Sequence, residues 1–451
     1  MTSAANTLNK NRWMLLVLLF AFVLRVGAAV YWHRSALPEN GFLRLGDSDG
    51  YWVLASHIAR GEPYQYGSEN ASVFRAPMMP LLLSPMTLIE DRSTAIFCAR
   101  IVGALLGTLS VYLVSLLAFR LAGKHAALAA ALLASLYPSA IGVSIIILSE
   151  MLFMPPMLTF LLLWSDSLQE GTTKQRVRLA LLTGIVGGLA ILARPSWLLF
   201  TPMVAVLGLG LVQRRVVFVQ TILWTGLGIS IAMMPWWVRN YNVTGKFVLT
   251  TLQVGPSLYD SFHPGASGGS DEGMNFMRRI EAEQTEADQA SAETSEGKVT
   301  SLESTFEWRI NRRAQLQAID WCLENPLEIP RLALAKLKKT WSLWPDGGDV
   351  GSPLIRAAVS LSMHTVMLLA FWGSWKLYRT QTLMLAICWS PCLYFTLLHM
   401  VFVGSVRYRE PAVIVLLAVA GCSLARWFFP QDSSVQDSSR VEFAKPDRST
   451  G

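Results

Sequence analysis

The first residues that could take part in a reaction are the two carboxylates in the run GDSDGY at residues 46–51. Asp47 and Asp49 are two positions apart, so they could share a divalent cation, or one of them could act as a general base. The same side chains could instead cap the helix expected at Tyr51–Arg60, because aspartate accepts hydrogen bonds from the first amide groups of a helix. The spacing alone leaves all three roles open.

A second set of candidate functional residues consists of arginines beside apolar runs. The planar fork of arginine binds two oxygens of a phosphate, so arginines that converge at one membrane face would suit an anionic lipid headgroup. For Arg75 the alternative is a side chain that reaches from an apolar surface into the headgroup region. The candidates are Arg75, Arg194, Arg239, Arg407 and Arg409.

Two more charged residues lie inside apolar runs, namely Arg25 and Glu150. Ionisable groups within a membrane are costly and are functional candidates for that reason. The alternative is a structural ion pair between the two. His399, at the end of another apolar run, has no neighbours at metal-ligand spacing, and we expect it to pack or to form a hydrogen bond.

The composition indicates the environment in which these residues lie. Of the 451 residues, 52% are hydrophobic and only 15% are charged, whereas soluble domains have about 25% charged residues. The net charge of +7 does not indicate nucleic-acid binding, because the basic residues stand at the ends of apolar runs, where they orient membrane helices. The sequence therefore predicts an all-α integral membrane protein.

A bilayer core of about 30 Å requires about 20 apolar residues per helix, and the apolar runs predict about ten membrane spans. These are Trp13–Tyr31, Ala95–Phe119, Ala126–Ala140, Val143–Trp164, Val177–Ala193, Trp197–Val212, Val216–Val238, Leu354–Trp375, Leu383–Val403 and Ala412–Phe429.

The basic residues also predict the orientation of these spans. Every second connection is basic, which places residues 1–12 and the tail 430–451 in the cytoplasm, the tail being disordered. The polytopic domain is then 13–429, with two long outer loops at 32–94 and 239–353. The arginines listed above fall on the outer face, against the usual charge bias.

The second outer loop divides in two. Gly265–Glu303 is rich in Gly, Ser, Glu and Asp and predicts a mobile, solvated stretch. Phe306–Trp344 has an amphipathic helical pattern, with Leu332 and Trp341 near Lys336 and Lys338. Such a segment can lie along the membrane surface, with tryptophans in the interface and lysines near lipid phosphates.

Seven stretches, in order and on the expected sides, resemble the GT-C class of membrane glycosyltransferases, in the family 39 group of protein O-mannosyltransferases and aminoarabinose transferases. The resemblance covers most of residues 12–429. Its motifs are GDSDGYWVLASHIARGEPY, FRAPMMPLLL, SEMLF, LARPSWLLF, PWWVRNYNVTGKFV, NPLEIPRLALAKLKKTWSLWP and SVRYREP.

The resemblance implies a GT-C-type helical bundle whose two outer loops carry amphipathic interfacial helices, in a bacterial inner membrane. It implies that Asp47 is the general base and that Tyr51 is the tyrosine four residues after it. Some relatives have two adjacent carboxylates at this position, whereas in this chain the second carboxylate is Asp49. A polyprenyl-phosphate sugar donor would leave its phosphate among arginines, where negative charge develops. The implied substrate-binding residues are Tyr51, Arg75, Glu150, Arg194, Arg239, Arg407 and Arg409.

Several points stay open at the level of sequence. The acceptor could be a protein, a lipid or a glycan, and no cofactor is certain, although Asp47 and Asp49 could hold a divalent cation. One alternative function is a transporter or lipid flippase that uses Arg25 and Glu150 along its pathway, but no internal repeat supports it. Another alternative is a catalytically inactive membrane scaffold.

Overall fold

The computed structural model describes residues 12–36, 38, 41–43, 46–66, 71–169, 171–211, 214–271, 274–294, 304–345 and 352–428. In this part of the chain, every regular element is a helix. The prediction of an all-α fold is therefore confirmed for the described residues. The predicted cytoplasmic N-terminus, apart from Arg12, and the predicted tail at 430–451 lie outside them.

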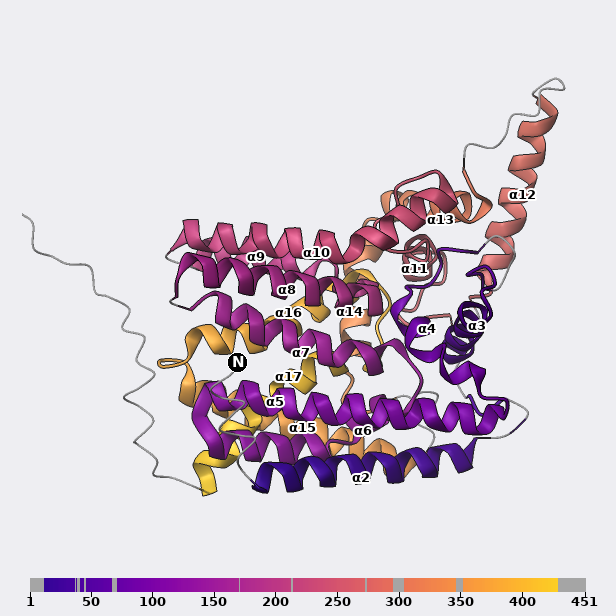
Figure 1. Cartoon of the computed structure of the whole chain (residues 1–451). Coiled ribbons are helices and arrows are strands. Elements are labelled where there is room, and N and C mark those ends of the chain that lie inside the picture. The colour runs from indigo at the N-terminus through magenta and orange to yellow at the C-terminus, as the bar shows by residue number, and fades with distance from the viewer. Residues whose placement is uncertain are drawn as a thin grey trace, which may run out of the picture.

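Most of the helices form one elongated bundle, and they run in roughly the same direction in Figure 1. The bundle consists of α2 (Arg12–Ser35), α5 (Arg92–Leu136), α6 (Pro138–Ile145), α7 (Ser149–Ser167), α8 (Thr173–Ala193), α9 (Phe200–Leu211), α10 (Arg215–Thr244), α15 (Pro353–Leu377), α16 (Thr382–Val401) and α17 (Val406–Phe428).

The remaining elements belong mainly to the two long loops. The first loop forms α3 (Gly46–Arg60), α4 (Met78–Leu83) and the short turn η2 (Met86–Leu88), and a second short turn, η3 (Pro195–Trp197), follows α8. The other loop forms α11 (Val254–Ser261), α12 (Phe276–Thr294), α13 (Phe306–Glu324) and α14 (Glu328–Thr340). Helices α3, α4, α11, α12 and α13 gather at one end of the bundle, on the right in Figure 1.

Among the described residues, seven helices are long and apolar enough to cross a membrane, or eight if α6 and α7, bent by 117°, form one span. This count takes the 45 residues of α5 as one helix, although its backbone is not helical at Ala122 and Gly123. Cys422 approaches Ala118 before this break, and the adjacent Gly421 packs on Ala130 after it. The two parts of α5 therefore fold back on each other. The predicted number of ten spans, and their orientation, stay predictions.

Small residues allow the bundle helices to pack closely. A Cβ atom on Gly184 of α8 would lie 2.1 Å from the backbone oxygen of Thr225, and one on Gly228 of α10 would lie 2.3 Å from that of Leu181. Between membrane helices, whose apolar surfaces gain little by leaving lipid, close contact between backbones is the main source of association. The contact between α8 and α10 therefore depends on glycine at these positions.

The second long loop is more ordered than its composition predicts. Within the stretch 265–303, residues 276–294 form helix α12, and its Ile280 is fully buried. Asp288 pairs with Arg309 of α13 at 2.8 Å, and Glu283 accepts a 2.6 Å hydrogen bond from Gln317. The prediction of a mobile stretch is therefore wrong for α12, because its acidic residues have partners on α13.

The amphipathic segment at 306–344 is confirmed as helical, but it is divided into α13 and α14 at Asn325 and Pro326, because proline has no amide hydrogen to donate. The expectation that Lys336 lies near lipid phosphates is wrong. Its side chain is fully buried, and Nζ donates a 2.7 Å hydrogen bond to the backbone oxygen of Val401. Val401 ends α16, where the last carbonyl groups lack partners within the helix.

Candidate functional site

Asp47 lies in the first turn of α3, and its two carboxylate oxygens bind different arginines. Arg75, just before α4, donates to Oδ1 at 2.7 Å, and Arg407, in the first turn of α17, donates two hydrogen bonds of 3.2 Å to Oδ2. Gln253 also accepts a hydrogen bond of 3.4 Å from Arg75. Asp47 therefore serves as the partner of two cations from distant parts of the chain.

Glu150 continues the same network deeper in the protein. It lies in the first turn of α7, a position that the helix dipole favours for an acid. Its Oε1 accepts from Nε of Arg407 and lies 2.6 Å from the guanidinium of Arg194, which follows α8. The charges thus alternate along Arg75, Asp47, Arg407, Glu150 and Arg194.

The two carboxylates of this network differ in their access to solvent. The side chain of Glu150 is 1% exposed, whereas that of Asp47 is 33% exposed, and Arg407 is 29% exposed. Three arginines and two carboxylates leave the network with a charge of +1. Asp47 is therefore the carboxylate that a reacting group can reach, and the excess positive charge suits an additional anion.

The arginines also determine the protonation state of Asp47. Burial on its own raises the pKa of this carboxyl, but Arg75 and Arg407 outweigh burial and hold the pKa below its ordinary value. Asp47 is consequently ionised at neutral pH and able to accept a proton, although the two guanidinium groups weaken it as a base.

Aromatic rings cover the arginines of the network. Arg75 lies over the ring of Tyr51, at 5.5 Å from its centroid, so this predicted residue does lie at the site. The ring of Tyr408 lies 5.4 Å from Arg194 and 5.7 Å from Arg407, and it stacks on His399. Sequence reasoning missed Tyr408, although it stands between two predicted arginines. His399 packs and forms a hydrogen bond with the backbone oxygen of Val403, as expected.

Asp49 does not share a site with Asp47. It faces Arg92 at 3.4 Å, and its side chain is 59% exposed. In the described part of the chain, no group of three or more His, Cys, Asp or Glu residues could hold a metal ion. The two aspartates thus diverge, as neighbours two positions apart do on a helix.

Two predicted arginines lie outside the network. Arg239 donates a 2.7 Å hydrogen bond to the backbone oxygen of Ser72 and lies over the ring of Tyr64. Arg409 is fully buried and donates to the backbone oxygens of Thr340 and Ser342, just after α14. The structure therefore places both arginines against backbone carbonyl groups and not against Asp47 or Glu150.

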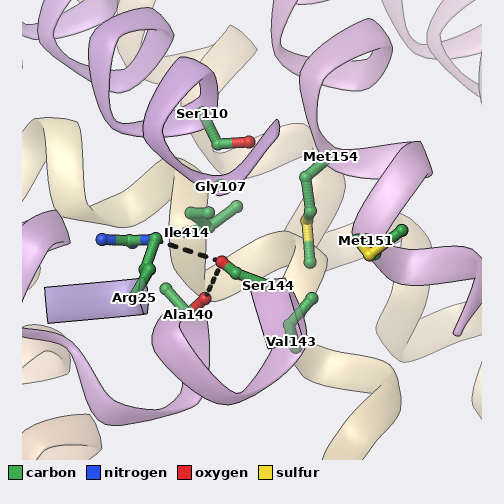
Figure 2. Close-up of a pocket in the computed structure, with 9 residues that line it drawn as sticks. All are labelled: Arg25, Gly107, Ser110, Ala140, Val143, Ser144, Met151, Met154 and Ile414. Atoms are coloured by element: carbon green, nitrogen blue, oxygen red, sulfur yellow. Dashed lines mark hydrogen bonds between the residues drawn. The ribbon is translucent and has the colours of Figure 1, made fainter. Parts of the chain in front are cut away.

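The alternative pairing of Arg25 with Glu150 is wrong. Arg25 lines a small cavity and donates a 3.2 Å hydrogen bond to Ser144, whose hydroxyl donates to the Ala140 oxygen (Figure 2). It also donates to the backbone oxygen of Ala134 at 3.1 Å. Ala134 is near the end of α5, where a free carbonyl group and the helix dipole both favour a cation.

Comparison with known proteins bears on this arrangement. Residues 74–238 match the family model of the dolichyl-phosphate-mannose-protein mannosyltransferases. The matched segment begins at Phe74, next to Arg75, and includes Glu150 and Arg194, whereas Asp47 and Arg407 fall outside it. No curated protein sequence matches the chain significantly.

Solved structures show a related fold. The oligosaccharyltransferase of Archaeoglobus fulgidus in the apo form is similar, with a TM-score of 0.53 and 15% sequence identity over 91% of this chain. The archaeal oligosaccharyltransferase AglB from the same organism, in complex with an inhibitory peptide and a dolichol-phosphate, gives a TM-score of 0.50 and 14% identity over 92% of this chain.

The chain has the fold of a GT-C glycosyltransferase. The resemblance stated from the sequence is therefore confirmed at the level of fold. The chain spans 50% of the length of each of these two oligosaccharyltransferases. ArnT from Cupriavidus metallidurans, bound to undecaprenyl phosphate, is a more distant structural match, with a TM-score of 0.40 and 15% identity over 90% of this chain and 77% of that one.

Proposed function

We propose that this chain is a membrane glycosyltransferase that takes a sugar from a polyprenyl-phosphate donor at the extracytoplasmic face, with Asp47 as its general base. The observation that carries the proposal is the contact of Asp47 with both Arg75 and Arg407. A partly exposed carboxylate next to two cations provides what the reaction needs, namely a proton acceptor and partners for a departing phosphate. The fold and the match at residues 74–238 support the same class.

The reaction follows from the charges of these residues. The acceptor hydroxyl gives its proton to Asp47, and its oxygen forms a bond to the anomeric carbon of the donor. The bond from that carbon to the phosphate oxygen breaks with inversion, and polyprenyl phosphate leaves with the electron pair. Arg75 and Arg407 stabilise the negative charge that develops on the phosphate. Arg194, which is 9% exposed, supports Arg407 through their shared contact with Glu150.

The donor phosphate should also activate the base. In the structure both oxygens of Asp47 are occupied by guanidinium groups. A phosphate that binds Arg75 and Arg407 draws these hydrogen bonds away from Asp47, which frees an oxygen for the acceptor hydroxyl. The phosphate also offsets the positive charge that keeps the pKa of Asp47 low.

The experiment that tests the proposal measures transfer from a panel of radiolabelled polyprenyl-phosphate sugars by membranes that contain the wild-type protein. Asp47→Asn is the test variant, and Asp49→Asn, which changes a nearby exposed carboxylate in the same helix, is the control. We expect transfer with the wild type and the control, and a loss of about 100-fold or more with Asp47→Asn. If the wild type uses no donor of the panel, the proposed reaction is wrong. Full activity of Asp47→Asn would show that another residue is the base.

A further inference from the structure

A single carboxylate of the second outer loop holds the backbone of the first. Glu307, in the first turn of α13, accepts hydrogen bonds from the amide groups of Ser72 and Val73. The distances to its Oε2 atom are 2.8 Å from Ser72 and 3.0 Å from Val73. Glu307 is 7% exposed, so water offers little replacement for these bonds.

Two further groups complete the hold on this segment. The guanidinium of Arg239 donates to the backbone oxygen of Ser72 at 2.7 Å, and the amide of Leu252 donates to the backbone oxygen of Val73 at 3.0 Å. Both amides and both carbonyl groups of these two residues are therefore bound by groups of the second outer loop or of α10. In the described part of the first loop, neither Ser72 nor Val73 belongs to a helix.

The held segment leads directly to the network. Arg75 is two residues after Val73, and its guanidinium must reach Asp47 at 2.7 Å. An error of about 1 Å in such a position can lower a rate about 100-fold. We propose that Glu307 is a positioning residue, which fixes the backbone at Ser72 and Val73 and thereby sets the position of Arg75 beside Asp47. The proposal rests on the proposed function for its effect on catalysis, but not for its effect on the backbone.

The hold should depend on pH near neutrality. Burial raises the pKa of Glu307 to about 7, although the amides of Val73 and Ser72 and the charge of Arg239 act in the opposite direction. The charged group that acts on Glu307 is Arg239 of α10, whose guanidinium also lies over the ring of Tyr64. The ionised carboxylate forms charge-assisted hydrogen bonds to both amides, but they do not offset the cost of its burial. Because the pKa of Glu307 lies above its ordinary value of 4.5, the held state binds more protons than an opened one up to about pH 7. The backbone at Ser72 and Val73 should therefore be held more firmly at pH 6 than at pH 8.

The first test measures hydrogen exchange in the purified full-length protein and needs no activity. We expect the protection of the Ser72 and Val73 amides, corrected for intrinsic rates, to be about tenfold higher at pH 6 than at pH 8. Gly255 provides the reference, because its amide donates to Asn311 of the same helix at 2.7 Å and does not contact Glu307. Equal protection of Ser72 and Val73 at the two pH values, with Gly255 unchanged, would overturn the proposal.

The second test uses Glu307→Gln, with Glu324→Gln, an exposed change in the same helix, as the matched control. We expect Glu307→Gln to give both amides the same protection at pH 6 and pH 8, and Glu324→Gln to retain the wild-type difference. In transfer assays, Glu307→Gln should remove the component of the wild-type pH profile of kcat that titrates near pH 7.

The two tests separate the inference from the proposed function. If the wild type shows no transfer but the amide protection follows the expected pattern, the proposed function fails and the hold by Glu307 stands. If transfer occurs and Glu307→Gln keeps the wild-type kcat and pH profile, Glu307 does not position Arg75. A variant that fails to fold leaves the wild-type exchange experiment decisive.

Discussion

Asp47 accepts two hydrogen bonds of 3.2 Å from the guanidinium of Arg407, a residue 360 positions later in the chain. The same guanidinium also binds Glu150, so Arg407 lies between a partly exposed carboxylate and a buried one. A cation in the first turn of a helix is disfavoured by the helix dipole, and the two carboxylates offset this cost. Any anion that enters the site must compete with Asp47 for Arg407.

Because of this competition, we expect Asp47→Asn to have opposite effects on catalysis and on binding. Asp47→Asn should lower sugar transfer about 100-fold or more, because an amide does not accept the proton of the acceptor hydroxyl. The same change should strengthen the binding of polyprenyl phosphate about tenfold, because it removes a carboxylate that neutralises Arg75 and Arg407. Titration of the purified variants with polyprenyl phosphate measures the second effect. Weaker binding by Asp47→Asn than by wild type would contradict a shared role of the two arginines.

Glu150 should matter chiefly for stability. It is almost completely buried between Arg194 and Arg407, so Glu150→Gln leaves two guanidinium groups without their buried anion. Removal of one member of a buried ion pair costs about 3–5 kcal/mol. Glu328→Gln, which removes an exposed pair with Arg331, is the control and should cost less than about 1 kcal/mol. Thermal unfolding in one detergent compares the variants, and equal melting temperatures would contradict this role of Glu150.

Part of the site was predictable, because the type of a residue and its place beside an apolar run can be read directly from the sequence. Asp47, Arg75 and Arg407 stand out as polar groups beside membrane spans, and the structure brings them together. The pattern gave no means to distinguish Arg407 from Arg409, because the direction of each side chain depends on the packing of α17 against α14. Arg407 turns to Asp47, whereas Arg409 turns to the carbonyl groups after α14.

The role of Glu307 could not be predicted for a related reason. Its partners are backbone amides of a loop 235 positions earlier in the chain, and no property of Ser72 or Val73 marks them in the sequence. The error on α12 has a similar cause, because the composition of a segment does not show that a neighbouring helix supplies partners for its charges. Contacts between the two long loops determine the first feature, whereas contacts of α12 with α13 inside the second long loop determine the other.

Arg25 should act on the fold and not on the donor. Arg25→Met keeps much of the apolar part of the side chain but leaves the Ala134 oxygen and the Ser144 hydroxyl without their donor. A buried group that loses its hydrogen-bond partner costs about 1–3 kcal/mol. We therefore expect a lower melting temperature with an unchanged dissociation constant for polyprenyl phosphate. A loss of binding at unchanged stability would instead assign Arg25 to a substrate pathway.

Lys336 makes stability depend on pH at alkaline values. Burial lowers the pKa of its ammonium group from 10.5 to about 8, although nearby Cys322 and Asp260 act in the opposite direction. The unfolded chain therefore binds more protons than the folded one between about pH 8 and 10.5, and the free energy of unfolding contributed by this group should rise with pH in that interval. Below pH 8, the ammonium is charged in both states, and its cost is fully present.

A substitution isolates this contribution from those of other groups. Lys336→Met removes the titrating group while it keeps the length of the side chain, so the increase of melting temperature between pH 8 and 10 should be smaller than in the wild type. Lys338→Met, an exposed change in the same helix, should retain the wild-type increase. If Lys336→Met and Lys338→Met show the same pH dependence, the ammonium of Lys336 is not the group that titrates. The buried lysine would then contribute only its hydrogen bond to the end of α16.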